Sequence, residues 1–424
     1  MKRIALLFPG QGSQYVGMGK SLYENYDIVK EVFEEASQVL NYDMKKMCFD
    51  STIEELTMTE NTQPALLTVS MAAYKVLCEE LQAEPLFGAG HSLGEISALT
   101  CAGAIDFADA LKLVKMRGKF MQEASSDGAT KMVSIIGSTA EEIGEWCKRE
   151  STEKEIAVIS NYNSPMQTVI SGHAAAVDRV TEFFQLKGVK TKELNVSAPF
   201  HSPLMESAAD RFHEELKKYT YHDLRWPVIS NYSALPYQGK ESILSNLTVQ
   251  IVSPVQWTNT MEYLESMGID TVIEVGSKRV LTSLTQKSTK ELKAYPTDKI
   301  DQIKQIIEAN KEKNGDENSD AKRLKNVIAR CMGIAVCIRN QNFDEAEYNA
   351  GVIEPYRKIK AMYETLEGEG MNPTVEQALQ AIEMLKSVFV TKKLPVEQQI
   401  MRFQQLFRET KSLYLFPEFK MPEC

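Results

Sequence analysis

A serine at position 92 lies in the pattern Gly90-His91-Ser92-Leu93-Gly94, which matches G-x-S-x-G, the motif called the nucleophile elbow. In this motif the serine occupies the tip of a sharp turn between a strand and a helix, where flanking positions must lack bulk. The turn exposes the serine oxygen, points the helix N-terminus at it and presents the Leu93 amide to a developing oxyanion. The pattern therefore predicts that Ser92 is a nucleophile, with a structural glycine-rich turn as the alternative.

A serine nucleophile needs a base, because its hydroxyl is essentially never ionised at neutral pH. The chain has five histidines. His91 is a poor base because neighbouring side chains on such a turn diverge, and we expect His173, His213 and His222 to be surface residues. His201 lies in the irregular sequence Ser-Ala-Pro-Phe-His-Ser-Pro, which is apolar before it and braced by two prolines. That setting suits a positioned and partly desolvated imidazole, so we prefer His201 as the base.

The elements that must position these residues alternate between strand and helix patterns. Strand-like and helix-like segments follow one another over residues 3–8, 19–39, 63–81, 86–89, 227–230 and 271–275. The first strand is closed by Pro-Gly-Gln-Gly-Ser-Gln, a tight loop whose amides can approach a ligand. A short strand, a serine-bearing turn and a helix of small residues are typical of an α/β-hydrolase-like core.

Residues 130–194 have a different pattern, in the order strand, helix, strand, strand, helix, strand. This is the order of the ferredoxin-like split unit. We therefore predict a ferredoxin-like subdomain over residues 128–195, inserted into a core formed by residues 1–127 and 196–290.

The C-terminal part of the chain has a third pattern. Residues 311–320 hold no apolar side chain, which indicates a solvated linker, and we place this linker at 291–320. Residues 321–424 have helical periodicity throughout and are predicted to form an all-helical extension. One helix is expected after an Asn372 cap with Pro373 at its first position, and another near Pro395. We expect their apolar faces to pack together, with a partner-docking surface as the alternative.

Composition excludes several classes of protein. Hydrophobic residues make up 43% of the 424 residues and charged residues 25%, which is ordinary for a globular protein. With 48 Lys+Arg against 58 Asp+Glu the net charge is −10, which disfavours nucleic-acid and anionic-membrane binding. Seven cysteines without C-x-x-C spacing predict reduced thiols. The first apolar run is too short for a signal peptide and none could span a bilayer, so we expect a cytoplasmic protein.

Five separated motifs occur in order along the chain. They are Gly-Gln-Gly-Ser-Gln at 10–14, Gly-His-Ser-Leu-Gly-Glu at 90–95, Arg117, Ala-Pro-Phe-His-Ser at 198–202, and Gln250 before Pro254-Val255. This set resembles the malonyl-CoA:acyl carrier protein transacylases, most of all the free-standing acyltransferases of trans-acyltransferase polyketide synthases. The resemblance covers residues 1–290. The helical segment beyond it departs from the plain fatty-acid enzyme and fits better with a polyketide-cluster protein.

The resemblance implies roles for five catalytic positions. Ser92 resembles the acylated nucleophile, and His201 resembles its general base and acid. The amides of Gln11 and Leu93 resemble the oxyanion hole. Gln250 resembles the residue whose backbone carbonyl orients the histidine in place of the Asp of a Ser-His-Asp triad. This replacement is physically acceptable because a carbonyl acceptor can also fix the tautomer.

Four further positions resemble substrate-binding residues. Arg117, which alone would be read as part of a solvated helix face, resembles the arginine that binds the extender-unit carboxylate. Its guanidinium fork matches a carboxylate bidentately. Phe200 resembles the residue that accompanies malonyl choice, since an aromatic ring fills the volume of an α-methyl group. Asn161 and Asn163 fall in an Asn-Tyr-Asn-Ser-Pro stretch like the family's and are expected to line the cleft.

The implied reaction moves a malonyl group from malonyl-CoA to the phosphopantetheine thiol of an acyl carrier protein through a malonyl-Ser92 ester. It would supply polyketide or fatty-acid synthesis and need no metal or other cofactor. The expected partners are malonyl-CoA, an acyl carrier protein and a polyketide synthase. One alternative is an acyl hydrolase that removes stalled acyl groups from carrier proteins. Another is a non-catalytic docking protein that works through its C-terminal helices.

Overall fold

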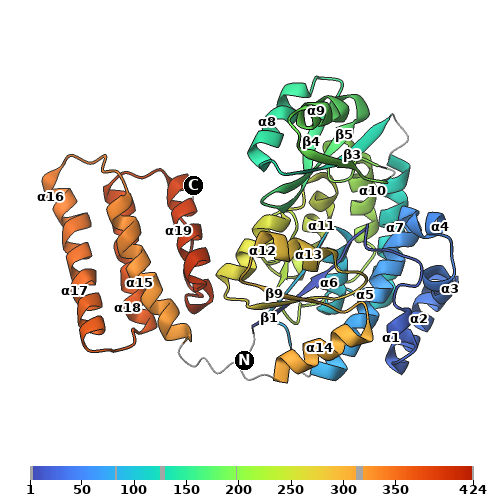
Figure 1. Ribbon diagram of the computed structural model, residues 1–424, viewed down its shortest axis with the longest axis horizontal. Coiled ribbons are helices and arrows are strands. Elements are labelled where there is room, and N and C mark those ends of the chain that lie inside the picture. Colours follow the sequence, from blue (N-terminus) through green and yellow to red (C-terminus); the bar gives the residue numbers. More distant parts are fainter. Residues whose placement is uncertain (1–2, 82–83, 125–128, 197, 312–318, 423–424) are drawn as a thin grey trace. The chain divides into compact units, whose positions relative to one another are not determined.

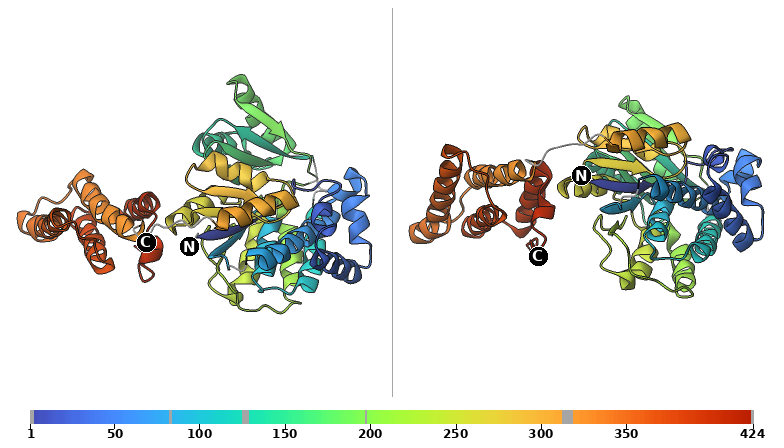
Figure 2. Two further views of the ribbon diagram at one scale, coloured as in Figure 1. Left: turned by 60° about the horizontal axis from the view of Figure 1, so that its bottom comes forward. Right: turned by 90° about the horizontal axis from the view of Figure 1, so that it is seen from below.

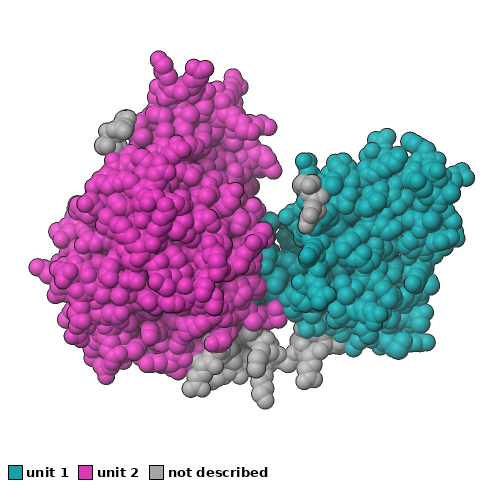
Figure 3. Space-filling view, turned by 180° about the vertical axis from the view of Figure 1, so that it is seen from behind, with its two compact units in different colours: residues 1, 262–269, 313–424 teal, residues 2–261, 270–312 magenta. Residues whose placement is uncertain are grey.

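The computed structural model describes residues 3–81, 84–124, 129–196, 198–311 and 319–422. The chain divides into two compact units, which Figure 3 distinguishes by colour. The larger comprises residues 2–261 and 270–312, and the smaller comprises residues 1, 262–269 and 313–424. Within the described ranges, no helix combines the length and the apolar character needed to cross a membrane.

A five-stranded parallel sheet lies at the centre of the larger unit, with helices around it (Figures 1 and 2). Its strand order is β7-β2-β1-β8-β9, and every neighbouring pair is parallel. The strands are β1 (Ile4–Phe8), β2 (Phe87–Gly90), β7 (Val228–Ile229), β8 (Thr271–Glu274) and β9 (Lys293–Pro296). Strand β1 is buried along its whole length, as expected for a central parallel strand made only of apolar residues.

The helices of the larger unit vary from one turn to 23 residues. They are α1 (Lys20–Tyr23), α2 (Asp27–Leu40), α3 (Met44–Phe49), α4 (Ile53–Thr57), α5 (Thr59–Leu81), α6 (Leu93–Cys101), α7 (Phe107–Glu123), α10 (Glu206–Leu216), α11 (Ile243–Val252), α13 (Val280–Ser288) and α14 (Ile300–Lys311). Helix α12 (Trp257–Ser266) belongs to the larger unit up to residue 261 and to the smaller unit from residue 262. The segment expected to be one helix over 19–39 is therefore two helices, α1 and α2.

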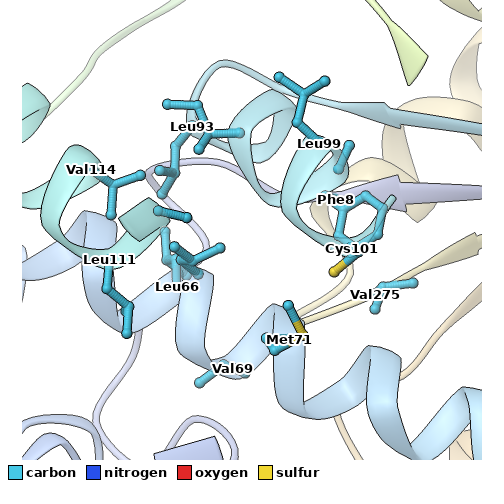
Figure 4. Close-up of a cluster of buried hydrophobic side chains, with 14 of the residues drawn as sticks. Phe8, Leu66, Val69, Met71, Leu93, Leu99, Cys101, Leu111, Val114 and Val275 are labelled. Carbon is cyan, nitrogen blue, oxygen red and sulfur yellow. The ribbon is translucent and has the colours of Figure 1, made fainter. Parts of the chain in front are cut away.

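Apolar side chains from β1, α5, α6 and α7 meet in the core of the larger unit (Figure 4). All nine residues of α6 are buried, so this helix has no solvent face. Its Leu93 and Leu99 belong to the same cluster as Phe8, Leu66 and Leu111. Burying one such side chain stabilises the fold by about 1.5–3 kcal/mol. This packing fixes the position of the helix that follows Ser92.

A second, antiparallel sheet belongs to the same unit and appears above the parallel sheet in Figure 1. Its strand order is β4-β5-β3-β6. Its elements in chain order are β3 (Thr130–Ile136), α8 (Ala140–Glu150), β4 (Ala157–Ser164), β5 (Gln167–His173), α9 (Ala174–Leu186) and β6 (Lys190–Glu193). The helices α8 and α9 cover one face with their own small apolar core, which includes Ile143, Val177 and Phe184.

The smaller unit is helical in its described part. Its elements from residue 319 onward are α15 (Ser319–Cys337), α16 (Glu345–Tyr348), the π-helical segment η4 (Asn349–Ile353), α17 (Glu354–Gly368), α18 (Val375–Thr391) and α19 (Val396–Thr410). Their apolar faces form one core, which includes Val327, Leu385 and Phe403. The buried ammonium of Lys392 donates to the carbonyls of Ala335 and Ile338, so it satisfies acceptors at the end of α15.

Two boundaries differ from the expectation. Helix α18 is capped by Thr374 and not by Asn372, because Thr374 and Gln377 form a reciprocal capping box. The range 291–320, expected to be a linker, contains β9 and α14, and its residues 312–318 lie outside the described residues.

The helix expected near Pro395 is α19, and Pro395 is its N-cap. The protein therefore has a mixed α/β fold with a parallel sheet, followed by helices.

Candidate active site

The serine turn joins the end of β2 to the start of α6. Ser92 has φ 54° and ψ −108°, a sparsely populated backbone conformation that costs about 1–3 kcal/mol in a non-glycine residue. A Cβ atom on Gly94 would lie 2.0 Å from the Phe8 carbonyl oxygen, and one on Gly90 would lie 1.9 Å from the Gly94 carbonyl. Only glycine fits these two positions, so the G-x-S-x-G pattern follows from close backbone packing around the serine.

Asn231, just beyond the C-terminal end of β7, holds this turn in place. Its Oδ1 atom accepts from the Ser92 amide at 2.6 Å, and its Nδ2 atom donates to the Gly90 carbonyl at 2.6 Å. Strands β7 and β2 are adjacent and parallel, so both segments emerge at the same edge of the sheet. The sequence analysis missed Asn231. The only signal was a polar residue soon after a short strand.

His201 is brought to Ser92 from 109 residues away. Its Nε2 atom lies 2.7 Å from Ser92 Oγ, and its Nδ1 atom lies 2.9 Å from the main-chain oxygen of Gln250. Because Nδ1 faces a carbonyl acceptor, it carries the proton, and Nε2 is left to accept one from the serine. Burial, and then the charge of Arg117, lower the pKa of His201 well below its ordinary value. The imidazole is therefore neutral at neutral pH, which is the form that can act as a base.

The other histidines have different partners. His91 Nε2 lies 2.8 Å from Asn163 Oδ1, and His173 Nδ1 accepts from the Ile156 amide at 3.0 Å. His213 Nδ1 lies 3.1 Å from Thr248 Oγ1. Among the described hydrogen bonds, Ser92 Oγ meets an imidazole only at His201. Of the histidines, the structure therefore places His201 within hydrogen-bond distance of the serine hydroxyl.

Arg117 is buried beside the serine. Only 1% of the residue is exposed, although the sequence around it is typical of a solvated helix face. Its Nη2 atom lies 3.3 Å from Ser92 Oγ, and its Nη1 atom donates to Gln63 Oε1 at 3.0 Å. Its buried Nε atom has no hydrogen-bond partner within the described part of the chain. Burial lowers its pKa to about 10, so the guanidinium stays charged at neutral pH.

Gln250 reaches this group with both of its amide atoms. Its Oε1 atom accepts from Arg117 Nη2 at 2.9 Å, and its Nε2 atom donates to the Ser92 carbonyl at 3.0 Å. The sequence analysis assigned a role only to its main-chain oxygen. It also missed Gln63, a buried residue of α5, for which the sequence offers no motif.

A cleft of about 490 Å³ opens over these side chains. The expected site residues that line it are Gln11, Ser92, Leu93, Arg117, Asn161, Asn163, Phe200 and His201. Gln250 does not line the cleft and joins the site through its hydrogen bonds. Strands of the antiparallel sheet contribute part of the wall, because Asn161 and Asn163 belong to β4 and Met132 to β3. The structure thus brings all nine expected residues to one place.

The arrangement is suited to acyl transfer on a serine. It combines a hydroxyl, a neutral imidazole within hydrogen-bond distance and a buried cation beside them. The described cysteines are free thiols. Across the described ranges, no group of three or more His, Cys, Asp or Glu side chains is arranged to hold a metal ion.

Comparison with known proteins identifies the class. The model of the acyl transferase domain matches residues 5–333, so the chain belongs to the acyl transferase family. Within it, the chain is 37% identical over 400 residues to a malonyl CoA-acyl carrier protein transacylase of Bacillus subtilis, covering 94% of this chain and 99% of that protein. It is 44% identical over 295 residues to the same-named protein of Escherichia coli K12, covering 69% and 95%. The chain is a member of the malonyl-CoA:acyl carrier protein transacylase family.

A solved structure agrees with this placement. It is a malonyl-transacylase in complex with its type II polyketide synthase acyl carrier protein. That transacylase is 39% identical, with a TM-score of 0.71, and the match covers 73% of this chain and all of that chain. The match to the Bacillus subtilis relative covers 94% of this chain, so it extends into the C-terminal part.

Proposed function

We propose that this protein transfers a malonyl group from malonyl-CoA to the phosphopantetheine thiol of an acyl carrier protein through an ester on Ser92. The observation that carries this proposal is the position of the buried Arg117 guanidinium, 3.3 Å from Ser92 Oγ. In a malonyl thioester, one methylene separates the carbonyl that is attacked from the carboxylate. A cation directly beside the nucleophile therefore suits this short diacid, and a bidentate pair with Arg is its strongest recognition.

In the first half of the reaction, Ser92 Oγ attacks the thioester carbonyl of malonyl-CoA while His201 Nε2 takes the hydroxyl proton. The main-chain oxygen of Gln250 holds the opposite side of the imidazole and stabilises the cation that forms. Collapse of the tetrahedral intermediate breaks the C–S bond, and the proton on Nε2 goes to the CoA sulfur. The products are free CoA and malonyl-Ser92.

In the second half, the phosphopantetheine thiol of the carrier protein gives its proton to His201 and attacks the ester carbonyl. The C–O bond to Ser92 breaks, and the serine oxygen regains the proton from Nε2. The same groups serve both halves because the first half moves the acyl group from a thiol to Ser92 and the second half moves it from Ser92 to a thiol. Water must be kept out of the cleft during this interval, since it would hydrolyse the ester.

We assign the oxyanion hole to the amides of Gln11 and Leu93. The support is that both residues line the cleft with Ser92, and that Leu93 is the first residue of α6. The N-terminus of that helix adds a favourable electrostatic field for an oxyanion. Removing one oxyanion donor typically costs about 100- to 1000-fold in rate.

We assign Phe200 to extender-unit choice and Asn161 and Asn163 to the cleft wall. Phe200 is buried and lines the cleft next to His201, where an α-methyl group on the substrate would compete for its volume. Asn163 holds the His91 ring at 2.8 Å, so its role includes shaping the turn beside the serine.

We further propose a description of the parts of the chain. The order of elements in the antiparallel sheet and its strand order support a ferredoxin-like subdomain over 128–195. The strand–serine–helix turn supports an α/β-hydrolase-like core over 1–127 and 196–290. Helices from 319 onward support a helical extension over 321–424. The reaction as written uses no cofactor, and we place it in the cytoplasm on the basis of the sequence.

We also propose that the carrier served is that of a polyketide synthase. One observation supports this: a similar transacylase was solved with a type II polyketide synthase acyl carrier protein. Fatty-acid synthesis is the alternative pathway. The hydrolase alternative is disfavoured because it does not need a carboxylate-binding arginine.

Intact-protein mass spectrometry tests the function directly. The chain is incubated with a mixture of malonyl-, methylmalonyl-, acetyl- and succinyl-CoA, and then with holo carrier proteins. We expect a malonyl adduct that is absent from Ser92→Ala and that moves to the carrier. If the acyl group appears as free malonate and not on any carrier, the hydrolase is the correct assignment.

A further inference from the structure

Glu95 is a buried carboxylate that the reaction above does not use. It is the third residue of α6, and the residue is fully buried. Its Oε2 atom accepts from the Asn231 amide at 3.0 Å and from Gln250 Nε2 at 2.7 Å, and its Oε1 atom accepts from the Tyr237 hydroxyl. These hydrogen bonds stabilise the ionised form of a carboxylate that burial alone would keep protonated.

The amide of Gln250 connects Glu95 to Arg117. Its Nε2 donates to Glu95 Oε2, and its Oε1 accepts from Arg117 Nη2 at 2.9 Å. No carboxylate in the described part of the chain lies within ion-pair distance of Arg117 itself. The cation and the anion are therefore held on the two ends of one neutral side chain.

We propose that Glu95 is the resting counter-charge of Arg117 and that it takes up a proton when a malonyl carboxylate occupies the arginine. This inference rests on the proposed function, since it needs a carboxylate-bearing acyl group at Arg117. Glu95 is thus a positioning residue: through Gln250 it keeps the empty guanidinium charged and in place.

The proton uptake follows from charge balance in a buried site. In the empty site there is one cation for one anion. A malonyl carboxylate adds a second anion, and two carboxylates around one buried guanidinium repel each other. The malonyl group forms the direct pair with Arg117, so Glu95, which is one amide farther away, accepts a proton from solvent. The site then holds one cation, one anion and one neutral carboxylic acid.

The groups that face Glu95 favour this response. Burial raises its pKa to about 7, while Tyr237, Gln250, the Asn231 amide and the charge of Arg117 hold the pKa down. Arg117 comes from α7 and Tyr237 from the segment after β7, and Tyr237 stays neutral because burial and Glu95 raise its own pKa. His201, beyond Arg117, is neutral as well. When the malonyl carboxylate cancels the field of Arg117, the pKa of Glu95 rises further.

Proton counting during loading tests the proposal. The full chain is mixed with malonyl-CoA in weakly buffered solution at pH 7.5 with a pH indicator, and the malonyl adduct is quantified by mass. Formation of the serine ester neither consumes nor releases a proton. The free CoA thiol then releases a small fraction of a proton, because it is slightly ionised at this pH. We expect about half to three-quarters of a proton taken up per malonyl-enzyme, because a carboxyl group with a pKa of about 7 is about three-quarters ionised at pH 7.5. Acetyl-CoA should give an acyl-enzyme without uptake, because it brings no carboxylate.

Two variants identify the group. Glu95→Gln should form the malonyl adduct more slowly, because Arg117 is less well positioned, and the proton uptake per adduct formed should fall to zero. Glu274→Gln is the matched control, because Glu274 is a buried carboxylate whose partners are Leu281 and Thr282 at the start of α13, and it should keep the full uptake. If Glu95→Gln does not fold, Tyr237→Phe is used. That variant removes a hydrogen bond that holds the pKa down, so the pH of maximal uptake should move upward.

The outcomes separate this inference from the proposed function. A malonyl adduct without proton uptake, or equal uptake in the wild type and Glu95→Gln, overturns the role of Glu95 and leaves the transfer reaction intact. Loss of uptake in Glu274→Gln overturns the assignment to Glu95 as well. Absence of any malonyl adduct in the wild type overturns the proposed function together with this inference.

Discussion

The main-chain oxygen of Gln250 accepts the Nδ1 hydrogen of His201 at 2.9 Å, while the side chain of the same residue holds Arg117. The orientation of the His201 ring is therefore independent of the side chain at position 250, whereas the orientation of Arg117 depends on that side chain. In a Ser-His-Asp triad, by contrast, the aspartate side chain itself binds the imidazole. The arrangement at Gln250 allows the two functions of the site to be separated by mutation.

Gln250→Ala should reduce malonyl loading and leave acetyl loading nearly unchanged. The imidazole keeps its carbonyl acceptor, whereas Arg117 loses a hydrogen bond to a charged group, worth about 1.5–3 kcal/mol. We expect kcat/KM for malonyl-CoA to fall by about 10- to 100-fold and that for acetyl-CoA to change by less than about threefold. Single-turnover loading with the two substrates measures this. Equal losses for both would show that the side chain acts on the Ser92 turn, whose carbonyl it also binds, or on the base, and not selectively on Arg117.

Arg117→Ala should abolish most malonyl loading while acetyl loading survives or rises. The guanidinium is the described cation nearest the serine, and removing it leaves the incoming carboxylate buried without a partner. When a buried polar group of the substrate has no partner in the site, kcat/KM typically falls by about four orders of magnitude. Arg117→Lys is the control: it restores charge but not the bidentate fork, so recovery should be partial. Unchanged malonyl loading by Arg117→Ala would remove Arg117 from the mechanism.

Phe200→Ala should admit methylmalonyl-CoA. The ring is buried in the cleft beside His201, and its removal opens the volume that an α-methyl group needs. One methyl group changes discrimination by about 1–3 kcal/mol, so the malonyl-to-methylmalonyl ratio should fall by about 10- to 200-fold. Competition between the two substrates, read by intact mass, gives the ratio directly. An unchanged ratio with unchanged loading would place the methyl group against another wall.

How far sequence reasoning reached can be judged from individual residues. Ser92 was predictable because its turn needs glycines at fixed positions, and these leave a pattern in the chain. The sequence that flanks Arg117, with its two lysines, predicts a solvent-exposed side chain. This prediction is wrong, because α7 packs against α5 and buries Arg117. Gln63 lies in no motif, Asn231 is marked only by its place after a short strand, and Glu95 ends the Gly-His-Ser-Leu-Gly-Glu motif without an indication of its role. They act through hydrogen bonds to residues that are far away in sequence, and only the fold brings them together.

Two glycine-to-alanine substitutions should change stability in opposite directions. A Cβ at Gly94 would lie 2.0 Å from the Phe8 carbonyl, so Gly94→Ala must displace backbone at the centre of the larger unit. We expect destabilisation of at least about 3 kcal/mol and loss of loading. Gly333 is an exposed helical residue four positions before the end of α15, with nothing near its Cβ position, so Gly333→Ala should stabilise by about 0.5–1 kcal/mol. Calorimetry of the full chain compares both with the wild type, and a tolerated Gly94→Ala would contradict the close packing described.

The stability of the protein should depend on pH through Glu95. Its pKa in the folded state is about 7, above the value of 4.5 in an unfolded chain, because burial opposes its charge. Between these two values the folded state retains a proton that the unfolded state has lost. The stability contribution of Glu95 is therefore fully present below pH 4.5 and declines as the pH rises to 7. Relative to Glu95→Gln, which has no such titration, the wild type should lose on the order of 2 kcal/mol between pH 5 and pH 8. Urea unfolding of both proteins at the two pH values measures this difference, and parallel pH profiles would show that the pKa of Glu95 is the same in the folded and unfolded chains.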